Sequence, residues 1–316
     1  MEPAPDQSSR RVWLGFAALA LLAGPVRSFT TDAFATAMGL QTLAGGALSG
    51  LLVGVVLLLF SVARRERMPG RTQWIALFVL LLPQWLAVPL TAPYVSSIPG
   101  LHDVRWGVLL TLALAAPLWL GLLSSMEWIS VEVPRAAIGA AIAGIGAVYL
   151  VIPAESYHLA WDQAPVLAIQ LLLSIAVVWS WAYAAPRLAD AGTSIVAASF
   201  LLLNALGSAG FSLLYERSAW QPVDWSGVLA PLLMEAAVVA CSCWLWFWLL
   251  QRMTLAGFSM RALAAWVAGL IPGFVMFGFL QWREDAALAI ALAAIVVALR
   301  ARVAEEQPTA LGLNSD

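Results

Sequence analysis

Long apolar stretches recur along almost the whole chain, and this recurrence constrains the fold more than any single motif. Between Val12 and Leu299 there are roughly ten stretches of about 14 to 23 mostly apolar residues, separated by short polar connections. A helix needs about 20 apolar residues to cross the hydrocarbon core of a bilayer, which is roughly 30 Å thick. Helices around a soluble core would instead keep a polar face. The sequence therefore predicts an all-α integral membrane protein.

The composition supports lipid as the solvent and excludes several functions. Hydrophobic residues make up 62% of the chain, charged residues make up 11%, and the mean hydropathy is +0.87. A net charge of −2 gives no electrostatic reason to expect nucleic-acid binding. All 16 basic residues are arginines, so chemistry that needs a lysine, such as a Schiff base or a P-loop, is excluded. We therefore expect no cofactor and no nucleotide-driven transport.

The apolar stretches predict ten transmembrane helices arranged as two inverted five-helix repeats. Two residue pairs recur at an offset of about 150 residues: Arg105 before Pro117 matches Arg261 before Pro272, and Trp74 before Gln84 matches Trp225 before Glu235. Because five is an odd number, the second half must lie upside down relative to the first, as in many transporters. The predicted spans are 12–34, 40–62, 74–94, 106–126, 136–152, 165–185, 194–214, 228–250, 262–280 and 286–299.

The arginines predict the orientation and the division of the chain. With the N-terminus inside, twelve of the 16 arginines fall on the cytoplasmic side, three fall outside and Arg27 lies within a span. Both termini and the connection 61–73 are therefore expected in the cytoplasm. The chain then divides into a cytoplasmic segment 1–11, a first repeat 12–153, a second repeat 165–302 and a cytoplasmic tail 303–316.

Several short motifs resemble the EamA-like family of the drug/metabolite transporter superfamily. They are the turn Glu132-Val133-Pro134, the glycines Gly139, Gly144 and Gly146, the stretch from Trp244 to Arg252, Pro272, Glu284, and Trp181-Ala182-Tyr183 with Arg187. The chain departs from the family pattern at Arg283, where a glycine is usual, at Gly24-Pro25-Val26-Arg27-Ser28, and in the last span, which has no glycine. These departures bear on the substrate more than on the fold.

The resemblance implies a secondary transporter that moves a small organic metabolite or drug-like solute across a bacterial inner membrane. Export is the favoured direction, protons are a candidate coupling ion, and membrane lipid surrounds the protein. The alternative is an integral membrane enzyme acting on a lipid or isoprenoid. Such an enzyme would need acidic, His or Arg side chains clustered at one membrane face, and the sequence shows no such cluster. A membrane scaffold or sensor would need a soluble domain or a long interaction tail.

Glu235 and Gln84 are the main candidates for a substrate site. Glu235 is expected near the bilayer centre, about 15 Å beyond Trp225, where a carboxyl group costs roughly 2.5–3.5 kcal/mol to insert. Such a residue typically serves a proton or substrate pathway, whereas the structural alternative is a hydrogen bond between helices. Gln84 occupies the matching place in the other half, with the same two interpretations.

Arg27, Trp85 and Trp244 complete the predicted substrate site. Arg27 would bind a carboxylate or phosphate, unless it extends outward to the interface or pairs with Asp32. Trp85 and Trp244 are expected deeper than the interfacial tryptophans and would stack on a substrate. No metal-ligand cluster is present in the sequence. Two further patterns concern packing: Pro83, Pro89 and Pro93 predict a broken or kinked third helix, and Gly46, Gly50 and Gly54 predict close packing of the second.

Overall fold

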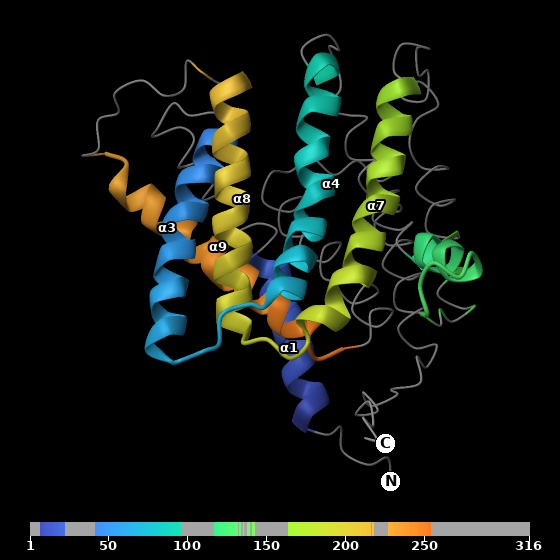
Figure 1. Ribbon diagram of the computed structural model, residues 1–316, viewed down its shortest axis with the longest axis horizontal. Coiled ribbons are helices and arrows are strands. Elements are labelled where there is room, and N and C mark those ends of the chain that lie inside the picture. The colour runs from blue at the N-terminus through green and yellow to red at the C-terminus, as the bar shows by residue number, and fades with distance from the viewer. Residues whose placement is uncertain are drawn as a thin grey trace, which may run out of the picture.

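Long α-helices make up the part of the protein that the structure, a computed structural model, describes. These residues are 7–22, 42–95, 117–131, 164–215, 217 and 227–253, with 133, 135, 138, 139, 141 and 142. The helices (Figure 1) are α1 (Gln7–Leu21), α3 (Thr42–Ala63), α4 (Arg71–Val95), α7 (Ala164–Leu188), α8 (Thr193–Tyr215) and α9 (Leu229–Leu250). A further short helix covers residues 117–125.

Four of the described helices are long and apolar enough to cross a membrane. They are the helical stretches Leu43–Ala63, Leu171–Leu188, Thr193–Tyr215 and Leu229–Leu250, within α3, α7, α8 and α9. Because lipid offers no hydrogen bonds to a bare backbone, segments of this composition satisfy their N–H and C=O groups internally as helices. The prediction of an all-helical protein is confirmed for the described region, which has four candidate membrane-spanning helices, and most predicted ends agree within a few residues.

The first helix begins earlier than the sequence predicted. The helix α1 begins at Gln7, about one turn before Val12, where we expect the membrane-spanning part to begin; the division at residue 11 stays a prediction. The apolar stretch marks the part of a helix that lies in lipid, whereas the helix itself continues through Arg10 and Arg11, which are good helix formers. The ninth and tenth predicted spans, and most of the fourth and fifth, lie outside the described residues. The count of ten and the repeat boundaries stay predictions.

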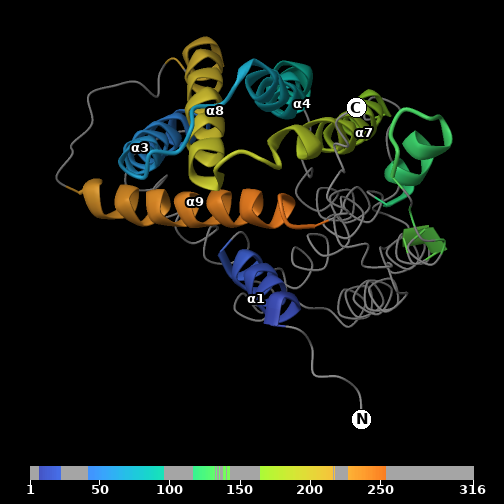
Figure 2. The same ribbon diagram turned by 60° about the horizontal axis from the view of Figure 1, so that its bottom comes forward.

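The helices pack mainly across the two predicted halves of the chain. The most extensive contacts join α3 with α8 and α4 with α7, and smaller ones join α3 with α9, α4 with α8, and α1 with α9. Figure 1 shows α3, α8, α4 and α7 running alongside one another, whereas α9 crosses behind α3 and α8. In Figure 2, α9 lies between α8 on one side and α1 on the other.

Glycines of α3 allow the close contact with α8. A Cβ atom added to Gly54 would lie 2.7 Å from Cγ of Leu202, and one added to Gly50 would lie 3.4 Å from Cβ of Ala205. The predicted packing role is therefore confirmed for Gly50 and Gly54. It is not seen for Gly46, which is exposed and has no described residue within 4 Å of the position that a Cβ would take. Each step of four residues turns the helix by about 40°, so the three glycines drift around α3 and only two of them face α8.

The prolines of α4 do not interrupt the helix. The helix is continuous from Arg71 to Val95, through Pro83 and Pro89, so the broken-helix prediction is wrong. A proline removes one backbone N–H and crowds the preceding turn, but a membrane helix tolerates it when neighbouring helices and local adjustment compensate. Here α7 and α8 pack against α4 and supply this support.

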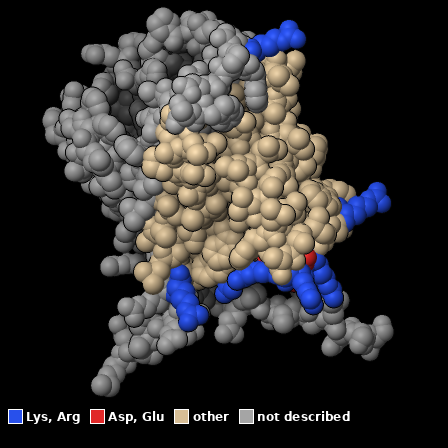
Figure 3. All heavy atoms as spheres, turned by 90° about the vertical axis from the view of Figure 1, so that its left-hand side faces the viewer, with Lys and Arg blue, Asp and Glu red and all other residues tan. Residues whose placement is uncertain are grey.

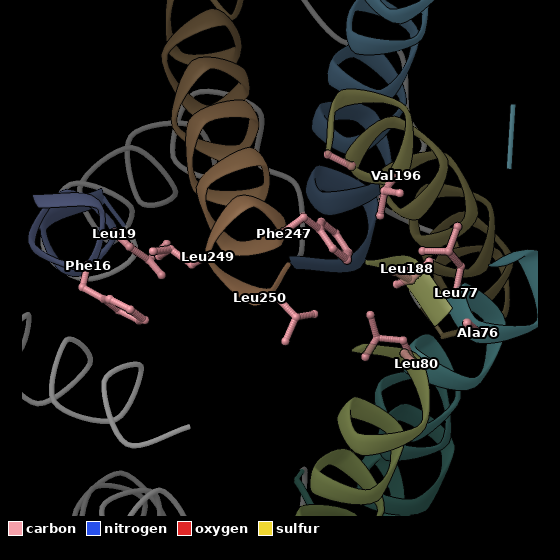
Figure 4. Packing of buried hydrophobic residues seen from close by; sticks show 12 residues of the cluster. Phe16, Leu19, Ala76, Leu77, Leu80, Leu188, Val196, Phe247, Leu249 and Leu250 are labelled. Atoms are coloured by element: carbon pink, nitrogen blue, oxygen red, sulfur yellow. The ribbon is translucent and has the colours of Figure 1, made fainter. Parts of the chain in front are cut away.

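The largest apolar cluster gathers α1, α4, α7, α8 and α9 at one end of the molecule. Its buried members include Phe16 of α1, Leu77 of α4, Leu188 of α7, Val196 of α8 and Phe247 of α9. Figure 4 shows these side chains converging between the helices. In a membrane protein such contacts stabilise the fold by close packing, because lipid is as apolar as the side chains themselves. This cluster fixes the ends of five helices relative to one another.

Candidate functional site

Arginines collect at the same end of the helices as the apolar cluster. The connection from α3 to α4 carries Arg64, Arg65 and Arg67, and Arg71 opens α4, while Arg187 and Arg252 lie at the ends of α7 and α9; all six are exposed. Figure 3 shows most of the described arginine side chains gathered along one edge of the molecule. Arg217 follows the opposite end of α8. We call this region the arginine-rich end.

Glu66 caps the start of α8 from a distant part of the sequence. Its Oε2 atom accepts a hydrogen bond of 3.0 Å from the backbone N–H of Ile195, in the first turn of α8. The residue before this helix is Gly192, and a Cβ added there would lie 2.5 Å from the same oxygen. Gly192 therefore leaves the space that Glu66 fills. A carboxylate at a helix N-terminus also interacts favourably with the helix dipole.

The turn after α3 places Glu66 at that position. The N–H of Glu66 donates to the carbonyl of Ser61 at 2.9 Å, and the N–H of Arg65 donates to the carbonyl of Val62 at 2.9 Å. This is the Schellman arrangement, in which the residue after the helix adopts a left-handed conformation. Arg65 does so with a φ of 56°, although glycine is the usual residue there.

Gln251 ties the end of α9 to the turn between α7 and α8. Its Nε2 atom donates to the carbonyl of Leu188 at 2.8 Å and to the carbonyl of Ala191 at 3.0 Å. Its Oε1 atom accepts a hydrogen bond of 2.6 Å from Oγ1 of Thr193. Together, Glu66 and Gln251 join α3, α7, α8 and α9 and satisfy backbone groups that helix ends leave unpaired. These hydrogen bonds thus hold the ends of the four helices together at the arginine-rich end.

We expect Glu66→Ala to destabilise the purified protein by about 0.5–2 kcal/mol, the usual cost of losing a side-chain cap at a helix N-terminus. The measurement is thermal unfolding in detergent. Glu66→Gln should cost less, because the amide oxygen can still accept the hydrogen bond. Arg67→Ala is the control, since Arg67 is exposed in the same connection. Equal effects of Glu66→Ala and Arg67→Ala would show that the cap adds no stability.

Glu235 is the one charged side chain among the buried residues that the structure describes. It is 5% exposed, and the other buried polar residues are serines. Serines such as Ser49 and Ser242 bond to carbonyls of their own helix, at 3.0 Å and 2.6 Å, so they tolerate apolar surroundings. Glu235 lies in α9 next to Ala236, which packs with Val53 of α3 and Leu201 of α8. Glu235 is thus a buried carboxyl group whose neighbour in α9 packs against α3 and α8.

Gln84 and Glu235 do not occupy equivalent places in their helices. Both lie roughly 20 Å from the arginine-rich end when the distance is counted along the helix axis, but α9 runs obliquely to α4 (Figure 1). Gln84 is more than three turns from the start of α4, whereas Glu235 is less than two turns from the start of α9. The side chain of Gln84 is exposed, in contrast to that of Glu235. A shared cavity for these two residues stays a prediction.

The two candidate tryptophans have different surroundings. Trp85 of α4 packs on Gly207 of α8 so closely that a Cβ on this glycine would overlap the indole ring. Its buried Nε1 atom has no hydrogen-bond partner among the residues that the structure describes, so within this part of the chain it is an unused donor near the middle of α4. Trp244 instead donates from Nε1 to Oγ of Ser194 at 3.4 Å and stacks on Trp248. These contacts give Trp244 a structural role, and substrate stacking there stays a prediction.

Asn204 of α8 is a candidate that the sequence analysis missed. It is half-buried near the middle of α8, roughly 16 Å from the arginine-rich end, and has no hydrogen-bond partner among the described residues. It lies two turns beyond Ala197, on the same face of α8, and Ala197 accepts a weak contact of 4.0 Å from Sγ of Cys243 in α9. An amide inside an apolar span is the signal that could have identified it.

The remaining predicted site residue, Arg27, lies outside the described residues. Within the part of the chain that the structure describes, no group of three or more His, Cys, Asp or Glu side chains is placed to hold a metal ion. The candidate residues on the described helices are thus Gln84 and Trp85 on α4, Asn204 on α8 and Glu235 on α9, and their meeting in one site stays a prediction. A carboxyl group, two amides and an indole N–H can bind a polar organic solute, and a carboxyl group can also take up a proton.

Comparisons with known proteins show the fold alone. No family model matches the chain, and no curated protein matches it. The structure is similar to a solved structure described only as "Crystal structure of protein", with a TM-score of 0.61 and 22% sequence identity. The similarity covers 93% of this chain and 96% of that chain. The protein thus shares an overall helical architecture with this structure.

Proposed function

We propose that the protein is a secondary transporter of the EamA-like type, which exports a small organic metabolite or drug-like solute across a bacterial inner membrane. The observation that carries this proposal is Glu235, a carboxyl group buried in a helix that is apolar enough to span a membrane. Ionisable groups at such positions are costly to insert, and they typically line substrate or proton pathways. Glu235 serves as the proton-binding or substrate-binding group, with Trp85 and Asn204 as hydrogen-bond donors to the solute.

The helix contacts support the inverted repeat that this proposal requires. In the proposed repeat, α1, α3 and α4 correspond to α7, α8 and α9. If each helix is replaced by its counterpart in the other half, the contact of α4 with α7 becomes the contact of α9 with α1, and both contacts are present. The same replacement turns α4 with α8 into α9 with α3, and it leaves α3 with α8 unchanged. The contact of α8 with α9 lacks an extensive counterpart between α3 and α4. This pattern is the one expected when two inverted halves pack around a common axis.

The hydrogen bonds at the arginine-rich end support alternating access. Transporters of this kind expose a central site to one side at a time by moving one half against the other. Glu66 bonds to Ile195, and these residues belong to different proposed halves. The apolar cluster and the contacts of Gln251 lie at the same end. We take this end as the closed cytoplasmic gate, and opening it requires the Glu66 cap to separate from α8.

The proposed orientation predicts where reporter fusions are active. A reporter fused at Gly70, in the exposed connection before α4, should report the cytoplasm, and so should one at the C-terminus. A reporter fused after Arg217, at the other end of α8, should report the periplasm. The reason is that arginine-rich connections are retained on the cytoplasmic side. Periplasmic activity at Gly70 would contradict the orientation and the placement of the gate.

The transport proposal is tested by comparing metabolites inside and outside bacterial cells with and without the protein. We expect one class of small organic solute to accumulate outside cells that produce the protein, and to accumulate inside cells that lack it. Cells that produce the Glu235→Gln variant at equal level in the membrane should resemble cells without the protein. If the solute profile is the same in all three strains across a broad metabolite set, the proposal is wrong.

A further inference from the structure

Two helices carry a ladder of two aromatic rings and an arginine that ends at the arginine-rich end. On α7, the rings of Trp179 and Tyr183 stack with centroids 5.7 Å apart, and the guanidinium carbon of Arg187 lies 3.7 Å from the centre of the Tyr183 ring. Residues four apart lie on the same side of a helix, so the three side chains form a continuous column. We call this column the α7 ladder.

The same spacing recurs on α9. Trp244 and Trp248 stack with centroids 6.3 Å apart, and the guanidinium carbon of Arg252 lies 4.6 Å from the centre of the Trp248 ring. However, Trp248 is partly covered by α1, since a Cβ on Gly15 would lie 3.1 Å from its ring. The α7 ladder is more open: Trp179 is 36% exposed and Arg187 is exposed. The α7 ladder is therefore the better candidate for binding a molecule from outside.

The guanidinium of Arg187 is held in place before any ligand binds. Its Nη1 atom donates to the carbonyl of Tyr183 at 2.6 Å, and the Tyr183 ring covers one flat face. Within the described part of the chain, the remaining N–H groups around the edge of the guanidinium make no further hydrogen bond. Arginine binds phosphate through two parallel hydrogen bonds from this edge, and a fixed guanidinium loses less freedom in doing so.

The exposed face of α7 changes along the helix as a phospholipid changes along its length. Leu172, which is 65% exposed, lies two turns from Trp179 on the same face, and Arg187 follows two turns later. From Leu172 to Arg187 the helix advances about 22 Å, close to the thickness of one bilayer leaflet with its headgroups. An apolar side chain, an aromatic ring and a cationic group thus follow one another along the helix. They match, in this order, the acyl chain, the glycerol region and the phosphate of a phospholipid.

The charge around the α7 ladder favours an anionic lipid over a zwitterionic one. Five further exposed arginines lie at the same end, from the α3–α4 connection, the start of α4 and the end of α9. Among the described residues, the nearby acidic groups are Asp190, which is exposed, and Glu66, whose carboxylate accepts the backbone hydrogen bond of α8. In this described part of the chain, positive charge therefore predominates where the headgroup would lie. Clusters of basic residues beside a membrane attract anionic headgroups.

From these observations we propose that the α7 ladder is a binding site for an anionic phospholipid, with the phosphate on Arg187 and the glycerol region against Tyr183 and Trp179. The site lies at the lipid-facing surface of α7 and is independent of the transport function proposed above. Its occupation stabilises the end of α7, where the carbonyl of Leu188 also accepts a hydrogen bond from Gln251.

The test is thermal unfolding of the purified full-length protein in detergent, with added phosphatidylglycerol or phosphatidylcholine. We expect phosphatidylglycerol to raise the unfolding midpoint at concentrations at which phosphatidylcholine leaves it unchanged. Arg187→Gln should weaken the apparent affinity for phosphatidylglycerol about tenfold, and Arg187→Lys should weaken it less because the charge remains. Tyr183→Leu should also weaken it, since the guanidinium loses its platform. Arg217→Gln, at the opposite end, should bind as the unaltered protein does.

Native mass spectrometry provides a second readout that does not depend on stability. It should show phosphatidylglycerol retained on the unaltered protein and largely lost from Arg187→Gln. Inorganic phosphate at the same concentrations should give no protection, because it lacks the acyl and glycerol contacts. Equal stabilisation by the two lipids, full protection by inorganic phosphate, or unchanged lipid binding in Arg187→Gln would overturn the proposal.

Discussion

Gly54→Leu is expected to disrupt the contact between α3 and α8 and to lower the stability of the protein by about 1–3 kcal/mol or more. A single Cβ at this position would already lie 2.7 Å from Cγ and 3.1 Å from the backbone nitrogen of Leu202. The backbone of α8 cannot yield as a flexible side chain would, so the helices must separate. Because α3 and α8 form the most extensive contact of the described helices, this change should have the largest structural effect.

The same helix supplies the matched control. Gly46 lies two turns earlier on α3 and has no described residue within 4 Å of the position that a Cβ would take, so Gly46→Leu adds the same side chain without a clash in this part of the chain. Gly54→Ala should fall between the two, because the clash is smaller and alanine favours a helix over glycine by up to about 1 kcal/mol. Thermal unfolding in detergent ranks the variants. Equal midpoints for Gly54→Leu and Gly46→Leu would mean that the packing of α3 on α8 is not as described.

Glu235→Gln is expected to abolish transport, or its dependence on pH, while the protein still folds and inserts. Glutamine keeps the size and the hydrogen-bonding capacity of the protonated acid but cannot release or take up a proton. The substitution therefore removes a buried carboxyl group with little change in side-chain volume. Transport of the exported solute, measured over a range of pH, shows the effect, and unfolding in detergent shows that the fold is kept.

Glu127→Gln is the control for Glu235→Gln, because it makes the same chemical change at an exposed turn position. It should leave transport and its pH dependence unchanged. If Glu235→Gln also transports at the full rate with an unchanged pH response, Glu235 only makes contacts between helices. The structural interpretation of this residue would then replace the functional one.

Helix positions were predictable from the sequence where an apolar stretch has clear polar limits. The predicted spans 40–62, 194–214 and 228–250 lie within two residues of the ends of α3, α8 and α9, because lipid excludes charged groups from the spans. The start of α1 was not predictable in this way. Arg10 and Arg11 end the apolar stretch but not the helix, since helix formation and burial in lipid obey different limits.

The contacts that close the arginine-rich end were not predictable from local patterns. Glu66 bonds to Ile195 over a sequence separation of 129 residues, and Gln251 bonds to Leu188 over 63 residues. Nothing near Glu66 in the sequence identifies the helix that it caps. Only Gly192, a helix start without a capping side chain, indicates that the acceptor must come from elsewhere.

The candidate site was predictable in part. An acid inside an apolar span identified Glu235, and the structure shows it buried. The match of Gln84 with Glu235 rested on their equal sequence distances from Trp74 and Trp225. These tryptophans are not equivalent, because Trp74 lies inside α4 whereas Trp225 precedes the start of α9. Asn204 was missed because an isolated amide in a span gives a weak signal until the neighbouring helices are known.

The most direct test of the transporter proposal is flux through the purified protein. Liposomes containing it should accumulate the solute that the cell comparison identifies when a proton gradient is imposed, without ATP. The rate should exceed that of protein-free liposomes, and liposomes with Glu235→Gln should show only the protein-free rate. Flux that strictly requires ATP hydrolysis, or no flux above protein-free liposomes for that solute, would contradict secondary transport by this protein.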